Sequence, residues 1–132
     1  WIYAAEILKF NLVLAGPDGY LSKVTNSFVT QTHDVKEAAR DADVLYTDVW
    51  VSMGLEAEKA KRAEVFKGYQ INDELVALAK KHALVQHCLP AYRGQEITER
   101  LFEARAGEIF DQAENRLHAQ KALLHWLTEP PL

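Results

Sequence analysis

The sequence is poor in cysteine, in excess positive charge and in long apolar runs, and each shortage excludes a class of protein. Its 132 residues include one cysteine, Cys88, so an internal disulfide is impossible and a reducing, cytoplasmic location is expected. The formal net charge of −4 disfavours binding to nucleic acid or to anionic membranes, because both need a dense basic patch. No apolar run approaches the roughly 20 residues that span a bilayer.

What is present is typical of one globular domain. Hydrophobic residues make up 48% of the chain and charged residues 26%, and 132 residues are enough to bury a core. The first ten residues, WIYAAEILKF, form an apolar, helix-like pattern without an initiator methionine or the basic start of a signal peptide. We therefore expect part of a longer protein, without a signal peptide.

Apolar runs alternate with amphipathic segments along the whole chain. Strands are predicted at 11–14, 27–31, 42–47, 83–87 and 107–110, and helices at 2–9, 35–41, 55–67, 72–82, around 97–102 and at 112–128. Asp34 and Asn72 are predicted to cap the helices that follow them. Because the predicted strands are nearly continuously apolar, we expect an α/β fold whose mostly parallel sheet is covered on both faces.

Ligands bind at the carboxyl ends of the strands in such a sheet. Three predicted strands end in polar residues that can carry chemistry, so the three clusters are expected to share one rim. The clusters are Asp48 with the loop DVWVSMG, then His87, Cys88 and Leu89, and finally Asp111, Glu114, Asn115 and Arg116.

The first cluster matches the two charged ends of an α-amino acid. The carboxylate of Asp48 can pair with an ammonium group, and Ser52 adds a hydroxyl. A backbone N–H of Met53 or Gly54 can hold a carboxylate. A purely structural role, in which Asp48 and Ser52 only cap and turn the chain, fits the same spacing.

The second cluster, HCLP at 87–90, leaves three roles open for the thiol of Cys88: nucleophile, ligand contact or buried structural group. His87 is adjacent in sequence, but neighbours on a strand point to opposite faces, so a Cys–His pair is not expected. One cysteine with scattered histidines matches no zinc-site spacing, and no metal is expected. The bond between Leu89 and Pro90 is a candidate for the cis form, which would turn a carbonyl toward the site.

The third cluster contributes Arg116, whose guanidinium can clamp a phosphate or polarise a carbonyl. It falls in the first turn of the helix predicted at 112–128, where the helix dipole disfavours a cation. An anionic partner is therefore expected, either a ligand or the neighbouring Glu114 or Asp111. A solvated arginine without a function fits equally well.

Taken together, three motifs in this order resemble the C-terminal half of ornithine carbamoyltransferase: YTDVWVSMG (46–54), HCLPAYRG (87–94) and DQAENR (111–116). The resemblance implies a three-layer, Rossmann-like α/β sandwich with a mostly parallel sheet, the second domain of the aspartate/ornithine carbamoyltransferase fold. It assigns residues 1–132 to the ornithine-binding domain. It also implies transfer of a carbamoyl group from carbamoyl phosphate to the δ-amine of L-ornithine, giving L-citrulline and phosphate without a cofactor.

The resemblance also implies a role for each matching position. Ornithine is held by Asp48, Ser52, Met53, Cys88 and Leu89. Carbamoyl phosphate is contacted by Cys88, Leu89 and Arg116, of which Cys88 and Arg116 are the catalytic residues. Two alternative functions remain open at this point. One is a carbamoyltransferase with another amine acceptor, and the other is an α/β binding module without catalysis.

The family's N-terminal, carbamoyl-phosphate-binding domain, with its Ser-Thr-Arg-Thr and His-Pro-x-Gln segments, does not appear in these 132 residues. We therefore expect this chain alone to bind ornithine weakly and to be inactive. Segments 1–9 and 112–128 are expected to be inter-domain helices, with Leu123, Trp126 and Leu127 partly bare. The family implies a homotrimer or a higher homo-oligomer.

Overall fold

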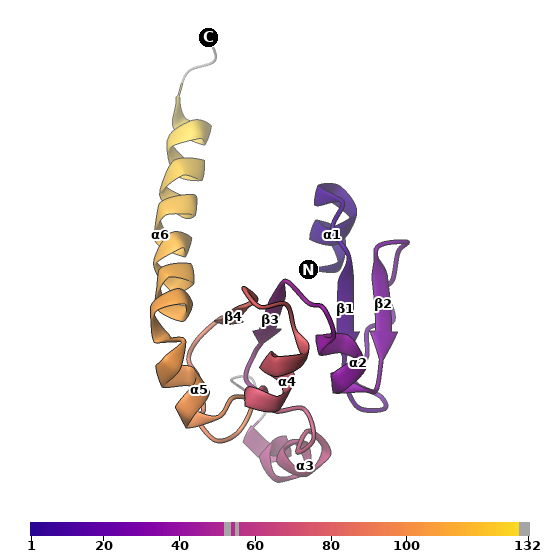
Figure 1. Ribbon diagram of the computed structural model, residues 1–132. Coiled ribbons are helices and arrows are strands. Elements are labelled where there is room, and N and C mark those ends of the chain that lie inside the picture. The colour runs from indigo at the N-terminus through magenta and orange to yellow at the C-terminus, as the bar shows by residue number, and fades with distance from the viewer. Residues whose placement is uncertain (52–53, 55, 130–132) are drawn as a thin grey trace.

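The computed structural model describes residues 1–51, 54 and 56–129, and it shows short strands alternating with helices (Figure 1). The strands are β1 (Leu12–Ala15), β2 (Val29–Thr32), β3 (Val44–Thr47) and β4 (Leu84–His87). The helices are α1 (Ile2–Leu8), α2 (Val35–Ala39), the short 3₁₀ helix η1 (Glu56–Glu58), α3 (Lys59–Val65), α4 (Asp73–Leu78), α5 (Glu99–Ala104) and α6 (Ala106–Thr128). The α/β prediction is confirmed.

All strand pairing in the described residues is parallel, and it forms two separate pairs. β1 pairs with β2, and β3 pairs with β4. In the second pair Val44 lies opposite Leu84 and Thr47 lies opposite His87. Both strands of that pair therefore end at the same edge, and the residues that follow them are brought side by side.

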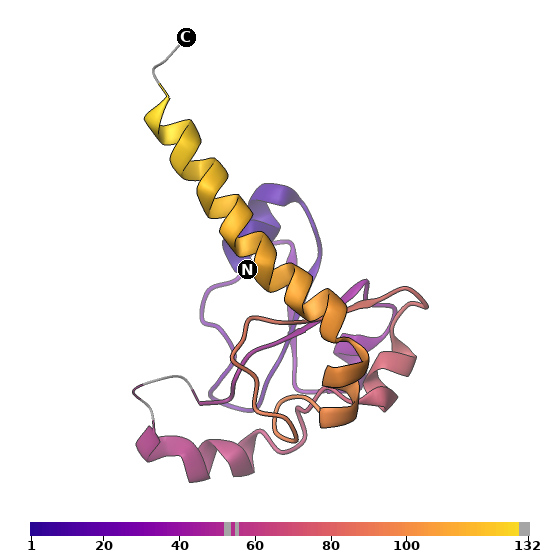
Figure 2. The same ribbon diagram turned by 90° about the vertical axis from the view of Figure 1, so that its left-hand side faces the viewer.

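The core lies around β3 and β4. Val85, Ile97 and Ile109 are fully buried there, and Leu101 and Phe102 of α5 pack against them. The two views agree that α6 lies on one side of the β3–β4 pair while β1, β2 and α2 lie on the other (Figures 1 and 2). This packing fixes the position of the strand ends that carry the candidate site.

The two predicted helix caps are confirmed. Asp34 Oδ1 accepts hydrogen bonds from the N–H groups of Lys36 at 2.8 Å and Glu37 at 3.3 Å, and Asn72 Oδ1 accepts one from the N–H of Leu75 at 3.0 Å. The helix predicted at 72–82 was too long, since α4 ends at Leu78. Beyond Leu78 the chain makes a tertiary contact in place of a further helical turn: the N–H of Lys80 donates to the carbonyl of Ala42 at 3.1 Å.

The strand predicted at 107–110 is wrong, because these residues form the first turns of α6. Glu108 and Asp111 flank Ile109 and Phe110, with Ala106 and Ala113 further out, and a run of two strand-favouring residues is too short to form a strand between helical segments. The helical position buries Ile109 completely and leaves Phe110 51% exposed. The last helix is thus confirmed in type but starts at Ala106, so Arg116 lies well inside it rather than in its first turn.

Among the described residues, much of α6 packs against no other element, as Figure 2 shows. Leu123, Trp126 and Leu127 are 53%, 71% and 63% exposed, which confirms the prediction that they are partly bare. Within the described ranges, no helix is both long enough and apolar enough to cross a membrane.

Candidate functional site

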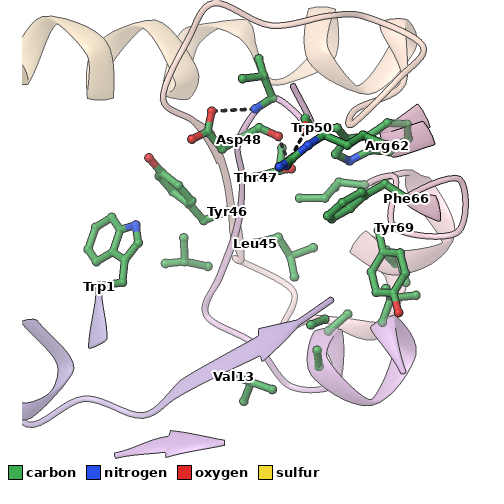
Figure 3. A pocket seen from close by; sticks show the side chains of 18 residues that line it. Trp1, Val13, Leu45, Tyr46, Thr47, Asp48, Trp50, Arg62, Phe66 and Tyr69 are labelled. Carbon is green, nitrogen blue, oxygen red and sulfur yellow. Dashed lines mark hydrogen bonds between the residues drawn. The ribbon is translucent and has the colours of Figure 1, made fainter. Parts of the chain in front are cut away.

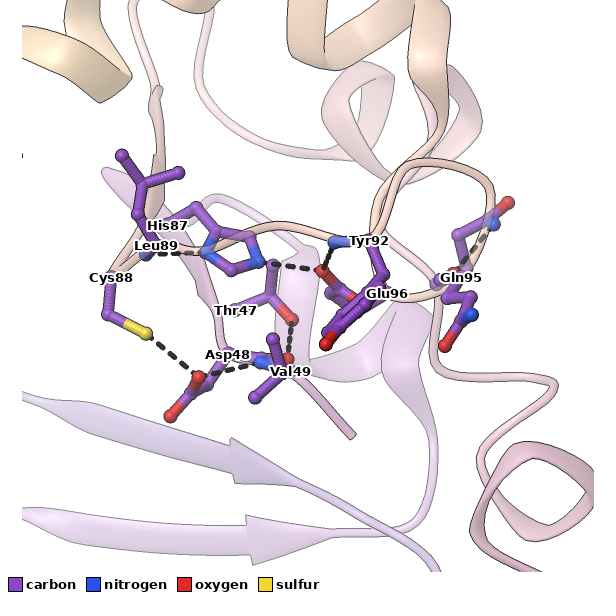
Figure 4. Close-up of polar contacts among 10 residues, drawn as sticks. Thr47, Asp48, Val49, His87, Cys88, Leu89, Tyr92, Gln95 and Glu96 are labelled. Atoms are coloured by element: carbon purple, nitrogen blue, oxygen red, sulfur yellow. Dashed lines mark hydrogen bonds and ion pairs between the residues drawn. The ribbon is translucent and has the colours of Figure 1, made fainter. Parts of the chain in front are cut away.

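Asp48 and Cys88 meet at the carboxyl edge of the β3–β4 pair. Because Thr47 lies opposite His87 in the parallel register, the next residue of each strand lies beside the other. The thiol of Cys88 donates a hydrogen bond to Oδ1 of Asp48 at 2.8 Å (Figure 4). The same oxygen accepts the N–H of Val49 at 2.6 Å, which fixes the orientation of the carboxylate.

The thiol at this site is held in its protonated form. Burial, together with the hydrogen bond to Asp48 and the negative charge of that carboxylate, raises the pKa of Cys88 to about 11. Tyr46 lies two residues before Asp48, on the same face of β3. Burial, followed by the neighbouring Cys88, raises the pKa of Tyr46 to about 12. At neutral pH the cluster therefore presents one anionic group, Asp48, flanked by a thiol and a phenol.

A cavity of about 510 Å³ borders this cluster between β1, β3 and the helices α2, α3 and α4 (Figure 3). Asp48 lines it together with an aromatic wall in which Trp50 stacks on Phe66 at 6.1 Å. Its cationic group, Arg62, is already paired with Glu58 through a 2.7 Å contact. A volume of this size accommodates a small organic ligand, and Asp48 gives it a negative charge that no cation pairs with among the described residues.

His87 does not contact the thiol, as the strand alternation predicted. Its Nδ1 accepts the N–H of Leu89 at 2.9 Å, and its Nε2 lies 2.8 Å from Oε1 of Glu96 (Figure 4). The bond between Leu89 and Pro90 is cis, which confirms that prediction. Leu89 itself has a φ of 55°.

The structure unites part of the predicted site. Asp48, Cys88 and Leu89 lie at one strand edge, while Ser52 and Met53 lie outside the described residues. Arg116 is exposed on α6, does not line the cavity, and has no hydrogen bond or ion pair within the described part of the chain. The expected convergence of Arg116 with the other two is therefore not seen, because it depended on a strand end at Phe110.

Two residues of the site were not predicted. Tyr46 could have been found from its spacing, since it shares a strand face with Asp48. Glu96 had no such signal, because its contact with His87 depends on the path of the turn between them.

A protein-family model described as "Aspartate/ornithine carbamoyltransferase, Asp/Orn binding domain" matches residues 1–127. The chain belongs to this family. An ornithine carbamoyltransferase of a Nitratiruptor species is 49% identical over 139 residues, covering 96% of this chain and 45% of the relative. One from Geobacter metallireducens is 52% identical over 133 residues, covering 94% of this chain and 44% of the relative.

Solved structures agree with the family assignment. The anabolic ornithine carbamoyltransferase from Campylobacter jejuni superposes with a TM-score of 0.88 at 38% identity, covering 96% of this chain and 46% of that structure. The enzyme from Thermus thermophilus gives a TM-score of 0.81 at 37% identity, covering 97% of this chain and 43% of that structure. The Rossmann-like α/β fold is thus confirmed, and the chain spans less than half the length of the relatives it matches.

Proposed function

We propose that this chain is the ornithine-binding half of an ornithine carbamoyltransferase, which transfers the carbamoyl group of carbamoyl phosphate to the δ-amine of L-ornithine. The products are L-citrulline and phosphate. Membership of the family supports the reaction class, and the names of the relatives support ornithine as acceptor. A protein with one cysteine in this chain fits a reducing, cytoplasmic location.

The observation that carries the proposal is the contact between Asp48 and Cys88 beside the cavity. A carboxylate next to a protonated thiol attracts an ammonium group and offers no competing nucleophile. In this role Asp48 holds the α-ammonium of L-ornithine. Ser52 and Met53 are assigned to the same substrate by resemblance alone.

The chemistry then needs orientation more than covalent catalysis. The lone pair of the neutral δ-nitrogen forms a bond to the carbamoyl carbon, the bond from that carbon to the phosphate oxygen breaks, and phosphate leaves with the electron pair. The δ-nitrogen loses one proton in the process, and the departing phosphate oxygen accepts it. Cys88 and the Leu89 carbonyl position the amine and the carbamoyl group, and because the thiol stays protonated no acyl-enzyme forms. Arg116 is proposed to contact carbamoyl phosphate, again by resemblance.

The second substrate requires protein beyond this chain. We propose that a carbamoyl-phosphate-binding domain packs against α1 and α6, whose exposed apolar residues include Ile7, Leu8, Leu123, Trp126 and Leu127. These helices, predicted as 1–9 and 112–128, are then the inter-domain helices. Assembly as a homotrimer or a higher homo-oligomer is part of the same proposal.

The test is acceptor selectivity of the full-length protein that contains this chain. At fixed carbamoyl phosphate, citrulline formation from L-ornithine is compared with carbamoylation of L-aspartate, putrescine and N-acetyl-L-ornithine. We expect carbamoylation of L-ornithine and of none of the other three amines. Preference for another amine would make the protein a sister carbamoyltransferase, and no product from any amine would make it a non-catalytic binding module.

A further inference from the structure

The buried charged or polar residues in the described part of the chain are His87 and Glu96, and both are 0% exposed. Their side chains meet at 2.8 Å between Nε2 and Oε1. Removing two ionisable groups from water is costly, and apolar residues of similar size fill a core more cheaply. We therefore expect the pair to have a role other than stabilising the fold.

The hydrogen bonds define where the proton of His87 lies. The N–H of Leu89 can only donate, so Nδ1, at 2.9 Å from it, is the acceptor and carries no proton. The ring proton of neutral His87 is then on Nε2, which donates to Oε1 of Glu96. The N–H of Tyr92 donates to the same oxygen at 2.6 Å.

These contacts form one continuous connection across a turn. It runs from the backbone of Leu89 through His87 to Glu96, and returns to the backbone at Tyr92 (Figure 4). The turn between them carries Cys88 and Leu89, and Leu89 has a φ of 55°, which is uncommon for a residue other than glycine. Such a conformation persists where surrounding contacts hold it, and the bond to His87 is one of them.

We propose that His87 and Glu96 are positioning residues that hold the turn at 88–92, so that the Cys88 thiol and the Leu89 carbonyl face the end of β3. This inference rests on the proposed function, in which that turn contacts the reacting amine. His87 acts through the backbone of Leu89 and does not touch the substrate. Glu96 acts one step further away, through His87 and the N–H of Tyr92.

Two substitutions in the full-length protein separate the two hydrogen bonds of the ring. Asparagine places an oxygen near the position of Nδ1, so His87→Asn keeps the acceptor for Leu89 and loses the contact with Glu96. Glutamine places an amide nitrogen near Nε2, so His87→Gln keeps the contact with Glu96 and leaves the N–H of Leu89 without its acceptor. Glu96→Gln is the conservative control, because its side-chain oxygen can still accept from both donors.

The first readout is alkylation of Cys88 by iodoacetamide as a function of pH, followed at that residue by mass spectrometry. In His87→Gln the turn is no longer held, and the Cys88 thiol moves away from Asp48. The pKa of the thiol then falls, and its alkylation rate at pH 8 rises about tenfold for each pKa unit lost. We expect a rise of at least about tenfold for His87→Gln, and a smaller rise for His87→Asn. Glu96→Gln should remain within about twofold of the wild type.

The second readout is the kinetics of citrulline formation. His87→Gln should lower kcat for ornithine at least about tenfold while the melting temperature stays near that of the wild type. Unchanged alkylation and kcat in a folded His87→Gln protein would overturn the proposal. If that variant does not fold, ¹⁵N NMR of the wild-type histidine decides, since a proton on Nδ1 would overturn the proposal and a proton on Nε2 supports it.

The two readouts also separate this inference from the proposed function. Should the wild-type protein form no citrulline, the proposed function fails, but the alkylation profiles still decide whether His87 positions Cys88. Should citrulline form while the alkylation profiles of all three variants match the wild type, only the positioning role fails.

Discussion

The thiol of Cys88 and the carboxylate of Asp48 lie 2.8 Å apart although 40 residues separate them in the chain. Two neighbouring parallel strands place them together, and the aromatic-walled cavity lies beside the carboxylate. This relationship determines which group carries charge, which group stays protonated, and where an amine can be bound.

Loss of the Asp48 charge should weaken use of ornithine. Asp48→Asn keeps the shape of the side chain but removes the partner of the substrate ammonium, which costs about 2 kcal/mol, or roughly 30-fold in kcat/KM. Steady-state citrulline formation measures this. Asp43→Asn is the matched control, because Asp43 lies just before the start of β3 and its carboxylate forms an ion pair with the exposed Lys80 at 2.8 Å. A similar loss in both variants would argue against a specific ammonium site.

The reactivity of Cys88 should be unusually low at neutral pH. With a pKa of about 11, less than one thiol in a hundred is ionised at pH 8, so the alkylation rate should keep rising with pH up to an inflection near 11. Asp48→Asn removes the carboxylate charge, one of the causes of the raised pKa, and should move the profile to lower pH. An inflection of the wild-type profile near the ordinary thiol pKa of 9.0 would contradict this.

Stability should decline in alkali. The pKa of Cys88 is raised from 9.0 to about 11 and that of Tyr46 from 10.0 to about 12, so folding favours the protonated forms. Their contribution is complete below about pH 9 and is lost as the pH rises to about 12. Melting temperatures of the full-length protein between pH 8 and 12 should fall less steeply for Tyr46→Phe than for the wild type. Tyr92, which is 48% exposed and lies outside α1 and α6, provides the control Tyr92→Phe, whose profile should match that of the wild type.

The helical assignment of residues 107–110 gives a stability prediction. Gly107 lies in α6, and a Cβ added there would meet no atom within 4 Å. Gly107→Ala should therefore stabilise the protein by about 0.5–1 kcal/mol in a denaturant titration, because alanine favours the helix. Gly19→Ala is the control and should destabilise the protein. A Cβ at Gly19 would also meet no atom within 4 Å, but the φ of 79° at this position disfavours alanine. Destabilisation by Gly107→Ala would contradict a helical conformation with free space at this position.

The strands β1 to β4 were predicted to within two residues at each end, because short apolar runs between turn residues identify buried strands well. The strand prediction for 107–110 was wrong because four residues do not distinguish a strand from part of a helix. The alanines on either side favour the helix that the structure shows. Helix ends were less predictable where a tertiary contact intervened, as at Lys80.

The meeting of Asp48 and Cys88 followed from the sequence, because parallel strands bring their carboxyl ends to one edge. The contact of His87 with Glu96 did not, since it depends on how residues 88–95 turn back. The position of Arg116 was predicted from a strand that the structure does not contain, and its role remains a prediction.

Protection of Cys88 by substrate tests whether the edge formed by Asp48 and Cys88 binds the ornithine amine. The full-length protein is alkylated with iodoacetamide at pH 9, with carbamoyl phosphate and either L-ornithine or N-acetyl-L-ornithine, whose α-amine carries no charge, and modification of Cys88 is quantified by mass spectrometry. If the edge formed by Asp48 and Cys88 binds the ornithine amine, L-ornithine slows alkylation in a saturable way and the acetylated compound does not. Equal alkylation rates with and without L-ornithine would contradict the account.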